Sequence, residues 1–263
     1  MSQIISIEHL YRSFRSYKRQ GSNNLLPARG SEHRIVACDD ITLDAKKGEL
    51  IGLVGPNGSG KTTFLRVLST VFLPDKGKIS IQGFDIVKDS LKVRNLISFV
   101  TSHNTNSYAR LSGRQNLEFF ASFYNLSPEE SRKRISILAE QFQVTKYLDI
   151  MFQEYSSGIK QRFHLVRGLL SDAPILFLDE PTKSLDPAAA REFCLFLRKE
   201  VQQKAKTIII ASHLLSEVVE IADRIAILEK GRLKGYGTLT ELENKMGKPN
   251  AGIDEIYHYY VNQ

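Results

Sequence analysis

Cysteine and long apolar stretches are both scarce in this chain. Its two cysteines, Cys38 and Cys194, fit neither the spacing of a metal site nor that of a redox pair. We therefore expect structural thiols in a reducing compartment. No apolar run approaches the roughly 20 residues of a membrane helix, and the first residues lack a basic segment followed by a long apolar one. These absences predict a soluble, cytoplasmic protein that reaches membranes only through a partner.

The composition is that of an ordinary globular protein. Of the 263 residues, 42% are hydrophobic and 25% are charged, which suits one large α/β domain or a domain with an inserted lobe. The net charge of +7 and the pI of about 9.3 could favour nucleic acid or anionic lipid headgroups. They could equally reflect a solvated basic surface. The charge therefore leaves the partner open.

One stretch, Gly55–Thr63, fits the pattern G-x-x-x-x-G-K-[ST] of phosphate-binding loops. It follows the β-branched run Leu50–Val54 and precedes Phe64–Leu68, whose apolar residues have helical spacing. Its glycines allow backbone N–H groups to wrap around an anion at a helix N-terminus. Lys61 would bring a charge to the β- and γ-phosphates, and Thr62 a hydroxyl group to Mg²⁺. The expected ATP contacts are Gly55, Pro56, Asn57, Gly58, Ser59, Gly60, Lys61, Thr62 and Thr63.

Several other segments predict strands of an α/β core. Pro174–Glu180 and Thr207–His213 are continuous apolar runs, which are typical of strands covered on both faces. Further strands are expected near residues 5–10, 34–37, 41–43, 78–81 and 97–100, and in a closing hairpin over 224–233. The polar, basic stretch Arg15–Arg34 predicts an exposed loop or a short surface helix.

From Leu111 to about Leu170 the pattern becomes helical. Ser127–Glu130 forms a capping box with proline at the first helical position. The expected core residues are Leu117, Phe119, Phe120 and Phe123, followed by the stripe Ile135, Leu138, Ala139 and Phe142. The segment contains no strand pattern, so we expect a helical lobe inserted into the α/β core.

A nucleotide site also needs a carboxylate at the end of a neighbouring strand to hold Mg²⁺. Asp179 ends an apolar run and fits this role, and Glu180 follows it. Because successive side chains of a strand point in opposite directions, we assign Asp179 to Mg²⁺ and Glu180 to the attacking water as general base. The alternative is a cap for the next helix. Pro181–Pro187 and the phosphate loop upstream favour the catalytic interpretation.

These motifs together resemble the ATP-binding subunit of an ATP-binding cassette (ABC) transporter. The matching segments are Gly55–Thr63, Tyr155–Arg162, Ile175–Thr182, Ser184–Asp186 and His213, in the family's order and spacing. The resemblance implies a P-loop NTPase (RecA-like) α/β core with an antiparallel β subdomain and an inserted α-helical subdomain. It implies one domain over 1–263, with the core at 1–100 and 171–240, the helical lobe at about 101–170 and a short tail at 241–263.

The resemblance also implies a head-to-tail dimer of cassettes, identical or different, with two ATP molecules at the interface. The signature loop facing the partner's ATP would be Tyr155, Ser156, Ser157, Gly158 and Ile159, and the D-loop Ser184, Leu185 and Asp186. His213 would sense the γ-phosphate and orient Glu180, unless it is a structural histidine. Phe14 aligns with the aromatic residue that stacks on adenine, although a core role is also open.

Two positions depart from the family pattern. The family has glutamine as a metal contact after the strand at 97–100, where this chain has Ser102 and His103. Serine is too short to reach Mg²⁺ as glutamine does, which puts a metal contact by Ser102 in doubt. His103 could take the place of the glutamine instead. The signature loop has Ser157 where glycine is commonest, and we expect its Cβ to loosen a close approach. Glu180 and His213 are both present, so we expect an active ATPase.

The stretch Thr101–Tyr124 resembles the segment that receives a coupling helix from a multi-span membrane permease. It includes Tyr108, Arg110, Arg114 and Gln115. With Ser157, it is most similar to cassettes of exporters of drugs, polysaccharides or lipid-linked glycans, and the insert Arg15–Arg34 is similar to that of some glycan exporters. The expected place is the cytoplasmic face of the cell membrane, with a separate permease.

Two other functions remain as alternatives. A soluble cassette acting on nucleic acid or ribosomes would use the positive charge. The chain has one cassette, no long coiled-coil insertion and no interleaving of aromatic and basic residues, so no nucleic-acid partner is expected. A regulatory module that binds ATP without turnover is supported only by Ser102 and Ser157.

Overall fold

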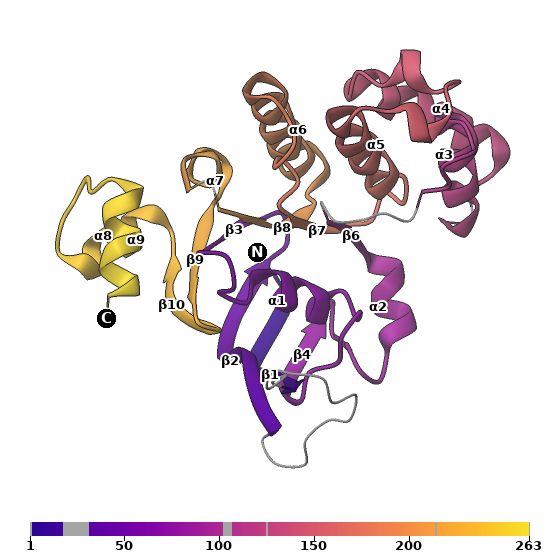
Figure 1. Cartoon of the computed structure of the whole chain (residues 1–263). Coiled ribbons are helices and arrows are strands. Elements are labelled where there is room, and N and C mark those ends of the chain that lie inside the picture. The colour runs from indigo at the N-terminus through magenta and orange to yellow at the C-terminus, as the bar shows by residue number, and fades with distance from the viewer. Residues whose placement is uncertain (1, 18–31, 102–106, 125, 214, 263) are drawn as a thin grey trace, which may run out of the picture.

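The computed structural model describes residues 2–17, 32–101, 107–124, 126–213 and 215–262. Two sheets lie on either side of helix α1, and most of the other helices cover the far face of the larger sheet (Figure 1). The smaller sheet is antiparallel and four-stranded, in the order β2-β1-β4-β5. Its strands are β1 (Gln3–Tyr17), β2 (Glu32–Lys46), β4 (Lys76–Ile81) and β5 (Phe84–Asp85).

The larger sheet has six strands in the order β10-β9-β3-β8-β7-β6, and only β10 pairs antiparallel. The strands are β3 (Leu50–Val54), β6 (Ile97–Thr101), β7 (Ile175–Asp179), β8 (Thr207–Ser212), β9 (Arg224–Glu229) and β10 (Arg232–Gly237). Every residue of β3, β7 and β8 is buried. The parallel pairing places the carboxyl ends of these central strands at one edge of the sheet.

The helices fall into groups around this sheet. Helix α1 (Lys61–Leu68) lies between the two sheets, and α2 (Ser90–Leu96) precedes β6. On the other face lie α3 (Gly113–Ala121), α4 (Pro128–Gln141), α5 (Ser157–Leu169), α6 (Pro187–Lys204) and α7 (Leu215–Ile221). Short 3₁₀ turns η1 (Ser122–Tyr124), η2 (Thr145–Tyr147) and η3 (Phe152–Glu154) connect α3, α4 and α5.

Alternate residues of the central strands serve two different cores. Leu176 and Leu178 of β7 pack in the cluster that contains α3–α6, whereas Ile175 and Phe177 pack in the cluster with α1 and the antiparallel sheet. This is why the run has no polar positions: both faces of the strand are covered. The strands predicted at 78–81, 97–100, 174–180 and 207–213 are confirmed within one or two residues. The closing hairpin is also confirmed, but its second strand runs four residues beyond the predicted end, to Gly237.

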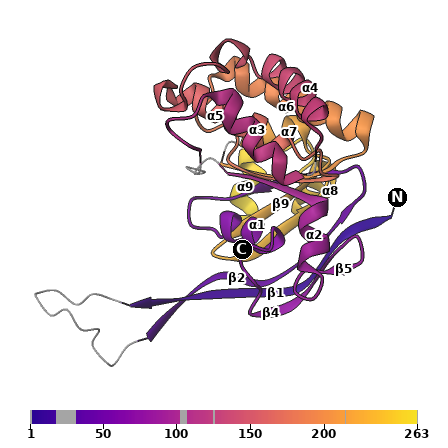
Figure 2. The ribbon, with the colours of Figure 1, turned by 90° about the vertical axis from the view of Figure 1, so that its right-hand side faces the viewer.

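The prediction of a loop or short helix over Arg15–Arg34 is wrong at both ends, and its middle, 18–31, lies outside the described residues. Strand β1 continues to Tyr17 and β2 begins at Glu32, so the two form one long antiparallel ribbon. This ribbon extends well beyond the rest of the sheet (Figure 2). Its polar, basic sequence hid the strands because an exposed ribbon needs no apolar alternation. The two separate strands predicted at 34–37 and 41–43 are likewise a single strand, β2.

The helical segment has the predicted capping box but not all of the predicted core. Ser127 Oγ accepts a hydrogen bond from the Glu130 N–H, and the Glu130 carboxylate accepts one from the Ser127 N–H. Leu117 and the stripe from Ile135 to Phe142 are buried. Phe119 and Phe123 were expected in the core, yet they are 38% and 65% exposed. Within the described residues of 111–170, the only β pairing is an isolated bridge, Ser112–Met151.

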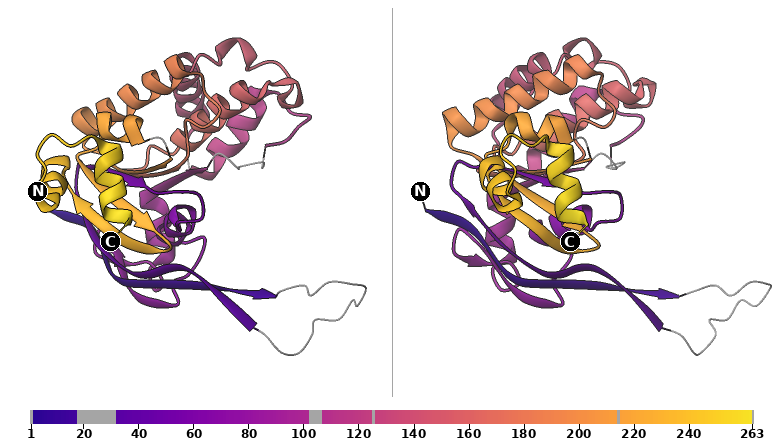
Figure 3. Two further views of the ribbon diagram at one scale, coloured as in Figure 1. Left: turned by 60° about the vertical axis from the view of Figure 1, so that its left-hand side comes forward. Right: turned by 90° about the vertical axis from the view of Figure 1, so that its left-hand side faces the viewer.

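The end of the chain adds helices α8 (Leu239–Met246) and α9 (Ile253–Val261), which lie beside β9 and β10 (Figure 3). Leu242, Ile256 and Tyr260 are buried in a third cluster with β9 and α7. The last segment is therefore packed onto the main sheet. Both cysteines are unpaired and buried, and burial raises the pKa of each thiol to about 12. None of the helices in the described part of the chain is long and apolar enough to cross a bilayer.

Candidate functional site

The phosphate loop lies between β3 and α1, where the sequence predicted it. Gly60 caps α1 at φ +107°, and a Cβ there would lie 2.2 Å from the Ala37 carbonyl oxygen of β2. Gly58 has φ +81°, but open space surrounds its missing Cβ. Glycine is thus required at 60 by backbone conformation and by space, and at 58 by conformation alone. A hydrogen bond from Gly231 N–H to the Ser59 carbonyl (2.9 Å) fixes the loop to the β9–β10 turn.

Lys61 lies inside this loop. It is 5% exposed, and Nζ donates hydrogen bonds to the carbonyl oxygens of Gly55 (2.6 Å) and Pro56 (3.0 Å). Burial lowers the pKa of Lys61, while Glu180 and Asp179 act against that shift. A cation beside a glycine-rich loop at a helix N-terminus is the arrangement that phosphate oxygens need.

Asp179 and Thr62 meet at the start of α1. The Thr62 hydroxyl donates a hydrogen bond of 3.0 Å to Asp179 Oδ1. Asp179 is 1% exposed, so burial raises its pKa, and the hydrogen bond from Thr62 acts in the opposite direction. A hydroxyl and a carboxylate are hard oxygen donors of the kind that Mg²⁺ takes together with substrate phosphates. The residues present therefore fit a magnesium ion.

Glu180 lies just beyond β7, and its position differs from the one expected. The strand ends at Asp179, and Glu180 has φ +49°, so strand alternation does not set its direction. Such left-handed backbone is costly for a residue with a side chain and is concentrated at functional sites. Its N–H donates to the Ala211 carbonyl oxygen of β8 (2.9 Å). The neighbouring strand thus anchors the residue.

The carboxylate of Glu180 lies between two nitrogen groups. Oε1 is 3.4 Å from His213 Nδ1, and Oε2 is 3.4 Å from Lys183 Nζ. The side chain of Glu180 is largely buried, whereas that of His213 is partly exposed. The structure therefore brings together the two residues to which the sequence assigned the hydrolytic step. Lys183 was missed, because a lysine in a polar loop carries no local signal.

Phe14 lies on β1, near the phosphate loop, and its ring contacts Phe72 and Arg12. Its ring meets Phe72 edge to face at 5.4 Å, and the Arg12 guanidinium lies 4.8 Å from its centroid. Its cross-strand partner Ile35 is two residues from Ala37, which contacts Gly60. The ring is only half-buried. Both the adenine role and a packing role are compatible with this position.

The signature loop caps helix α5. Ser156 Oγ accepts a hydrogen bond from the Ile159 N–H, and the helix begins at Ser157, inside the motif rather than after it. Ser156 and Ser157 are exposed, and a Cβ on Gly158 would meet only the Ser184 carbonyl oxygen, at 3.6 Å. Tyr155 is buried, and its hydroxyl donates to the Tyr147 carbonyl. Ser156–Gly158 therefore face outward, and Tyr155 anchors them from behind.

The D-loop lies beside the signature loop. A depression of about 370 Å³ is lined by residues of both, including Ser156, Gly158, Ser184 and Asp186. Asp186 caps α6 by accepting the Ala189 N–H (2.9 Å). The cap of this helix is thus Asp186, which contradicts the alternative that Asp179 and Glu180 serve as its cap.

Ser102 and His103, where the family would place its glutamine, lie outside the described residues. The preceding residue, Thr101, ends β6 and pairs in register with Asp179. The strand thus leads toward the carboxylate expected to hold Mg²⁺.

The segment expected to receive a membrane partner carries an exposed group of aromatic rings. Tyr108, Phe119 and Phe123, with the half-buried Phe120, form this aromatic patch. Tyr108 and Phe123 each meet Phe119 edge to face, at 5.0 and 5.1 Å. Arg110 is exposed, Arg114 forms a two-pronged ion pair with Asp149, and Gln115 completes the capping box of α3. Solvent-exposed rings in contact with one another are a common feature of interaction surfaces.

Comparison with known proteins adds an independent line of evidence. The family profile described as "ABC transporter" matches residues 38–183. The ABC transporter ATP-binding protein NatA of Bacillus subtilis is 32% identical over 208 residues, which cover 79% of this chain and 84% of NatA. The daunorubicin resistance ATP-binding protein DrrA3 of Streptomyces coeruleorubidus is 36% identical over 211 residues. That match covers 80% of this chain but only 66% of DrrA3.

The fold has close counterparts among solved structures. A structure described as an ATP-binding subunit of an ABC transporter superposes with a TM-score of 0.82 at 26% identity. The match covers 98% of this chain and 99% of the other. The predicted fold class, a P-loop α/β core with an antiparallel sheet and additional helices, is thereby confirmed.

Proposed function

Because this chain belongs to the ABC transporter family, we propose that it binds and hydrolyses ATP as the subunit that powers a membrane transporter. The observation that supports this most is the meeting of three loops at one edge of the sheet. Lys61 lies in the loop after β3, Asp179 ends β7, and His213 follows β8 beside Glu180. Ligands of parallel sheets bind at this edge.

Each residue has a separate task in the proposed reaction. Lys61 and the loop N–H groups bind the phosphates and offset their charge. Thr62 and Asp179 would hold Mg²⁺, which would supply positive charge to offset that of the phosphates. Glu180 accepts the proton of the attacking water, and His213 orients that carboxylate. Phe14 is proposed to stack on adenine.

A second cassette would complete the site. Ser156–Gly158 face solvent at a helix N-terminus, which favours an anion outside this chain. We propose that they bind the γ-phosphate of ATP held by another subunit. The D-loop of this chain, Ser184–Asp186, lies beside them and would contact the same subunit. The proposed domain remains the whole of 1–263, with the core at 1–100 and 171–240, the helical lobe at about 101–170 and a tail at 241–263.

The proposed partner is a separate multi-span permease at the cytoplasmic face of the membrane. The aromatic patch and Arg110 offer it an apolar and basic surface. Export of a drug-like molecule is supported by the name of DrrA3, and the glycan or lipid-linked alternatives come from the resemblance of the insert 15–34.

Phosphate release by the parent protein and by Glu180→Gln tests the proposal. We expect turnover in the parent and a loss of roughly 100-fold or more in the variant, with ATP still bound. Glu140→Gln, on the exposed side of α4, is the matched control and should equal the parent. Equal turnover in Glu180→Gln would contradict its role as base. ATP binding without any phosphate release in the parent would favour the regulatory alternative.

The partner is tested by purification from native membranes in mild detergent. Recovery with a stoichiometric multi-span protein supports the transporter and narrows its cargo. Recovery with RNA or ribosomes and no membrane protein would favour the alternative of a soluble cassette.

A further inference from the structure

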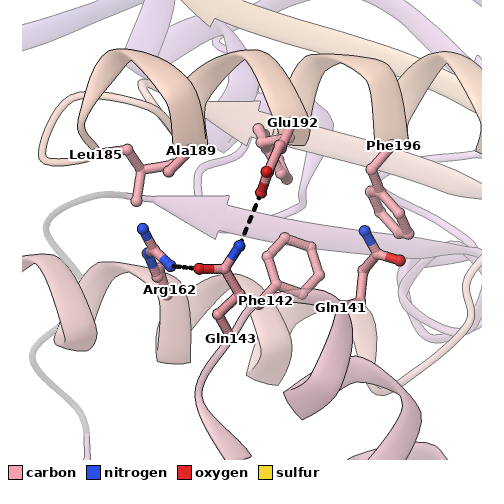
Figure 4. Close-up of a pocket in the computed structure, with 9 residues that line it drawn as sticks. Gln141, Phe142, Gln143, Arg162, Leu185, Ala189, Glu192 and Phe196 are labelled. Atoms are coloured by element: carbon pink, nitrogen blue, oxygen red, sulfur yellow. Dashed lines mark hydrogen bonds between the residues drawn. The ribbon is translucent and has the colours of Figure 1, made fainter.

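A side chain that no motif contains connects the signature helix with the helix that follows the D-loop. Gln143 lies just after α4, at φ +56°, and its amide extends between α5 and α6 (Figure 4). Its Oε1 accepts a hydrogen bond of 2.9 Å from Arg162 Nη1 of α5. Its Nε2 donates one of 3.0 Å to Glu192 Oε2 of α6.

Arg162 extends this connection to the D-loop. Its other terminal nitrogen, Nη2, lies 3.0 Å from Asp186 Oδ2. The second oxygen of Asp186 accepts the Ala189 N–H that starts α6. Glu192, Gln143, Arg162 and Asp186 thus form one chain of hydrogen bonds, which we call the Gln143 relay. Its three side-chain hydrogen bonds join residues that are 49, 19 and 24 positions apart in the sequence.

The apolar packing beneath the relay is incomplete. A small cavity of about 20 Å³ lies there, lined by side chains that include Phe142, Leu185, Phe193 and Phe196 (Figure 4). That is room for about one water molecule. The relay thus adds polar contacts between α5 and α6 at a place where their apolar packing leaves this space.

The relay lies directly behind the outward-facing surface. Arg162 and Gln143 line the same depression as Ser156, Gly158 and Ser184. Arg162 is on the helix that begins with the signature loop, and Asp186 ends the D-loop. A change in the relay would therefore shift one loop relative to the other without touching the phosphate loop.

We propose that Gln143 is a positioning residue that holds the signature loop and the D-loop in one rigid surface for the ATP of a second subunit. This inference rests on the proposed function. A neutral amide suits the place because it can accept from a guanidinium and donate to a carboxylate at the same time. Glutamate would keep the contact to Arg162 but would face Glu192 with a like charge.

The first test compares Gln143→Leu with Gln141→Leu, which alters another residue lining the cavity. We expect maximal ATP turnover to fall by roughly fivefold in Gln143→Leu, the order expected for loss of a side-chain hydrogen-bond pair. The affinity of the isolated subunit for ATP should stay unchanged, so the effect is on turnover and not on binding. Equal turnover in the two variants would overturn the inference.

The second test exchanges the two groups. Gln143→Glu should lower turnover, and the double variant Gln143→Glu/Glu192→Gln should recover most of it, because a donor again faces a carboxylate. Failure of this rescue would contradict a positioning role. Hydrogen exchange gives a readout that does not need hydrolysis. The amides of 184–189 should exchange faster in Gln143→Leu than in Gln141→Leu.

Exchange also separates the two proposals. A parent protein without ATP turnover would contradict the proposed function. If the exchange difference were nevertheless present, the relay would still position the D-loop. If the parent hydrolyses ATP but the amides of 184–189 exchange equally fast in Gln143→Leu and Gln141→Leu, the role of Gln143 is overturned and the proposed function stands.

Discussion

The phosphate side and the signature side of this molecule are built in opposite ways. On the phosphate side, Lys61 and Asp179 are buried, and each already has a hydrogen-bond partner within the chain. On the signature side, Ser156 and Ser157 are exposed and Gly158 is half-buried, and Ser156 Oγ accepts the Ile159 N–H to cap α5. The residues of the phosphate side are thus buried within this chain, whereas those of the signature side lie at its surface.

The difference separates what a single subunit can do from what it cannot. Substitutions on the phosphate side should alter ATP binding by the subunit itself. Substitutions on the signature side should leave that binding intact and alter only the step that needs a second subunit.

The largest effect is expected for Lys61→Ala. It removes the charge that meets the phosphates and leaves the carbonyl oxygens of Gly55 and Pro56 without their donor. ATP affinity and turnover should both fall, the latter by roughly 100-fold or more. Fluorescent-nucleotide titration and phosphate release measure the two. Parent-like affinity in a folded variant would mean that the loop binds nucleotide by its backbone alone.

The opposite side is tested by Gly158→Glu. The nearest atom to a new Cβ is the Ser184 carbonyl oxygen at 3.6 Å, so the chain itself tolerates the side chain. Its carboxylate would oppose the phosphate of the second subunit, and turnover should fall by about tenfold or more. ATP affinity of the isolated subunit should not change. Gly252→Glu is the control, because a Cβ there meets nothing within 4 Å and the residue lies outside this surface, and its turnover should equal that of the parent. A loss of ATP binding in Gly158→Glu would contradict the proposed division between the two sides.

Within the phosphate side, Gly60→Ala and Gly58→Ala separate crowding from backbone strain. Alanine at 60 meets the Ala37 carbonyl oxygen at 2.2 Å as well as a left-handed backbone, whereas alanine at 58 meets only the latter. We expect losses of about 3 and about 1 kcal/mol in the free energy of unfolding. Urea unfolding measures both. Equal losses in the two variants would show that Ala37 of β2 can move away from a side chain at position 60 without a cost in free energy.

The smallest effect concerns the buried back of the signature helix. Burial, helped by Arg167 and Lys160, lowers the pKa of His164 to about 4. The unfolded chain, with a pKa near 6.5, binds more protons between these values, so stability falls as the pH drops from about 6.5 toward 4. This should cost about 1 kcal/mol between pH 7.5 and 5.5. Unfolding titrations of His164→Phe should lose that part of the pH dependence, and an unchanged slope would place the titrating group elsewhere.

The sequence predicted the phosphate side well because its signals are local. Gly60 and Lys61 belong to a motif whose spacing is dictated by one loop, and the run before Asp179 is apolar at every position because both faces of β7 are covered. Strand ends and glycine positions follow from such patterns. The direction of the Glu180 side chain could not be predicted in this way, because its left-handed backbone breaks the strand alternation on which the prediction relied.

Other features depend on contacts between distant segments. Leu117 and Ala121 lie on one side of α3, and Phe119 lies about 200° away from Leu117 on the other; Phe123 follows in the turn η1. Residue type alone could not decide which side is buried. The relay through Gln143 was equally invisible, because its partners lie 19 and 49 residues away.

The central claim is that this chain carries half of each ATP site and that a second cassette supplies the other half; we propose that an identical copy can serve as that cassette. Sedimentation velocity of Glu180→Gln with and without Mg²⁺-ATP tests it most directly, because the variant should keep ATP bound. We predict a monomer without ATP and a species of twice the 29.8 kDa chain mass with it. The signature-side variant Gly158→Glu/Glu180→Gln should bind ATP and stay monomeric. A Glu180→Gln protein that binds ATP and remains monomeric at every concentration would contradict the account.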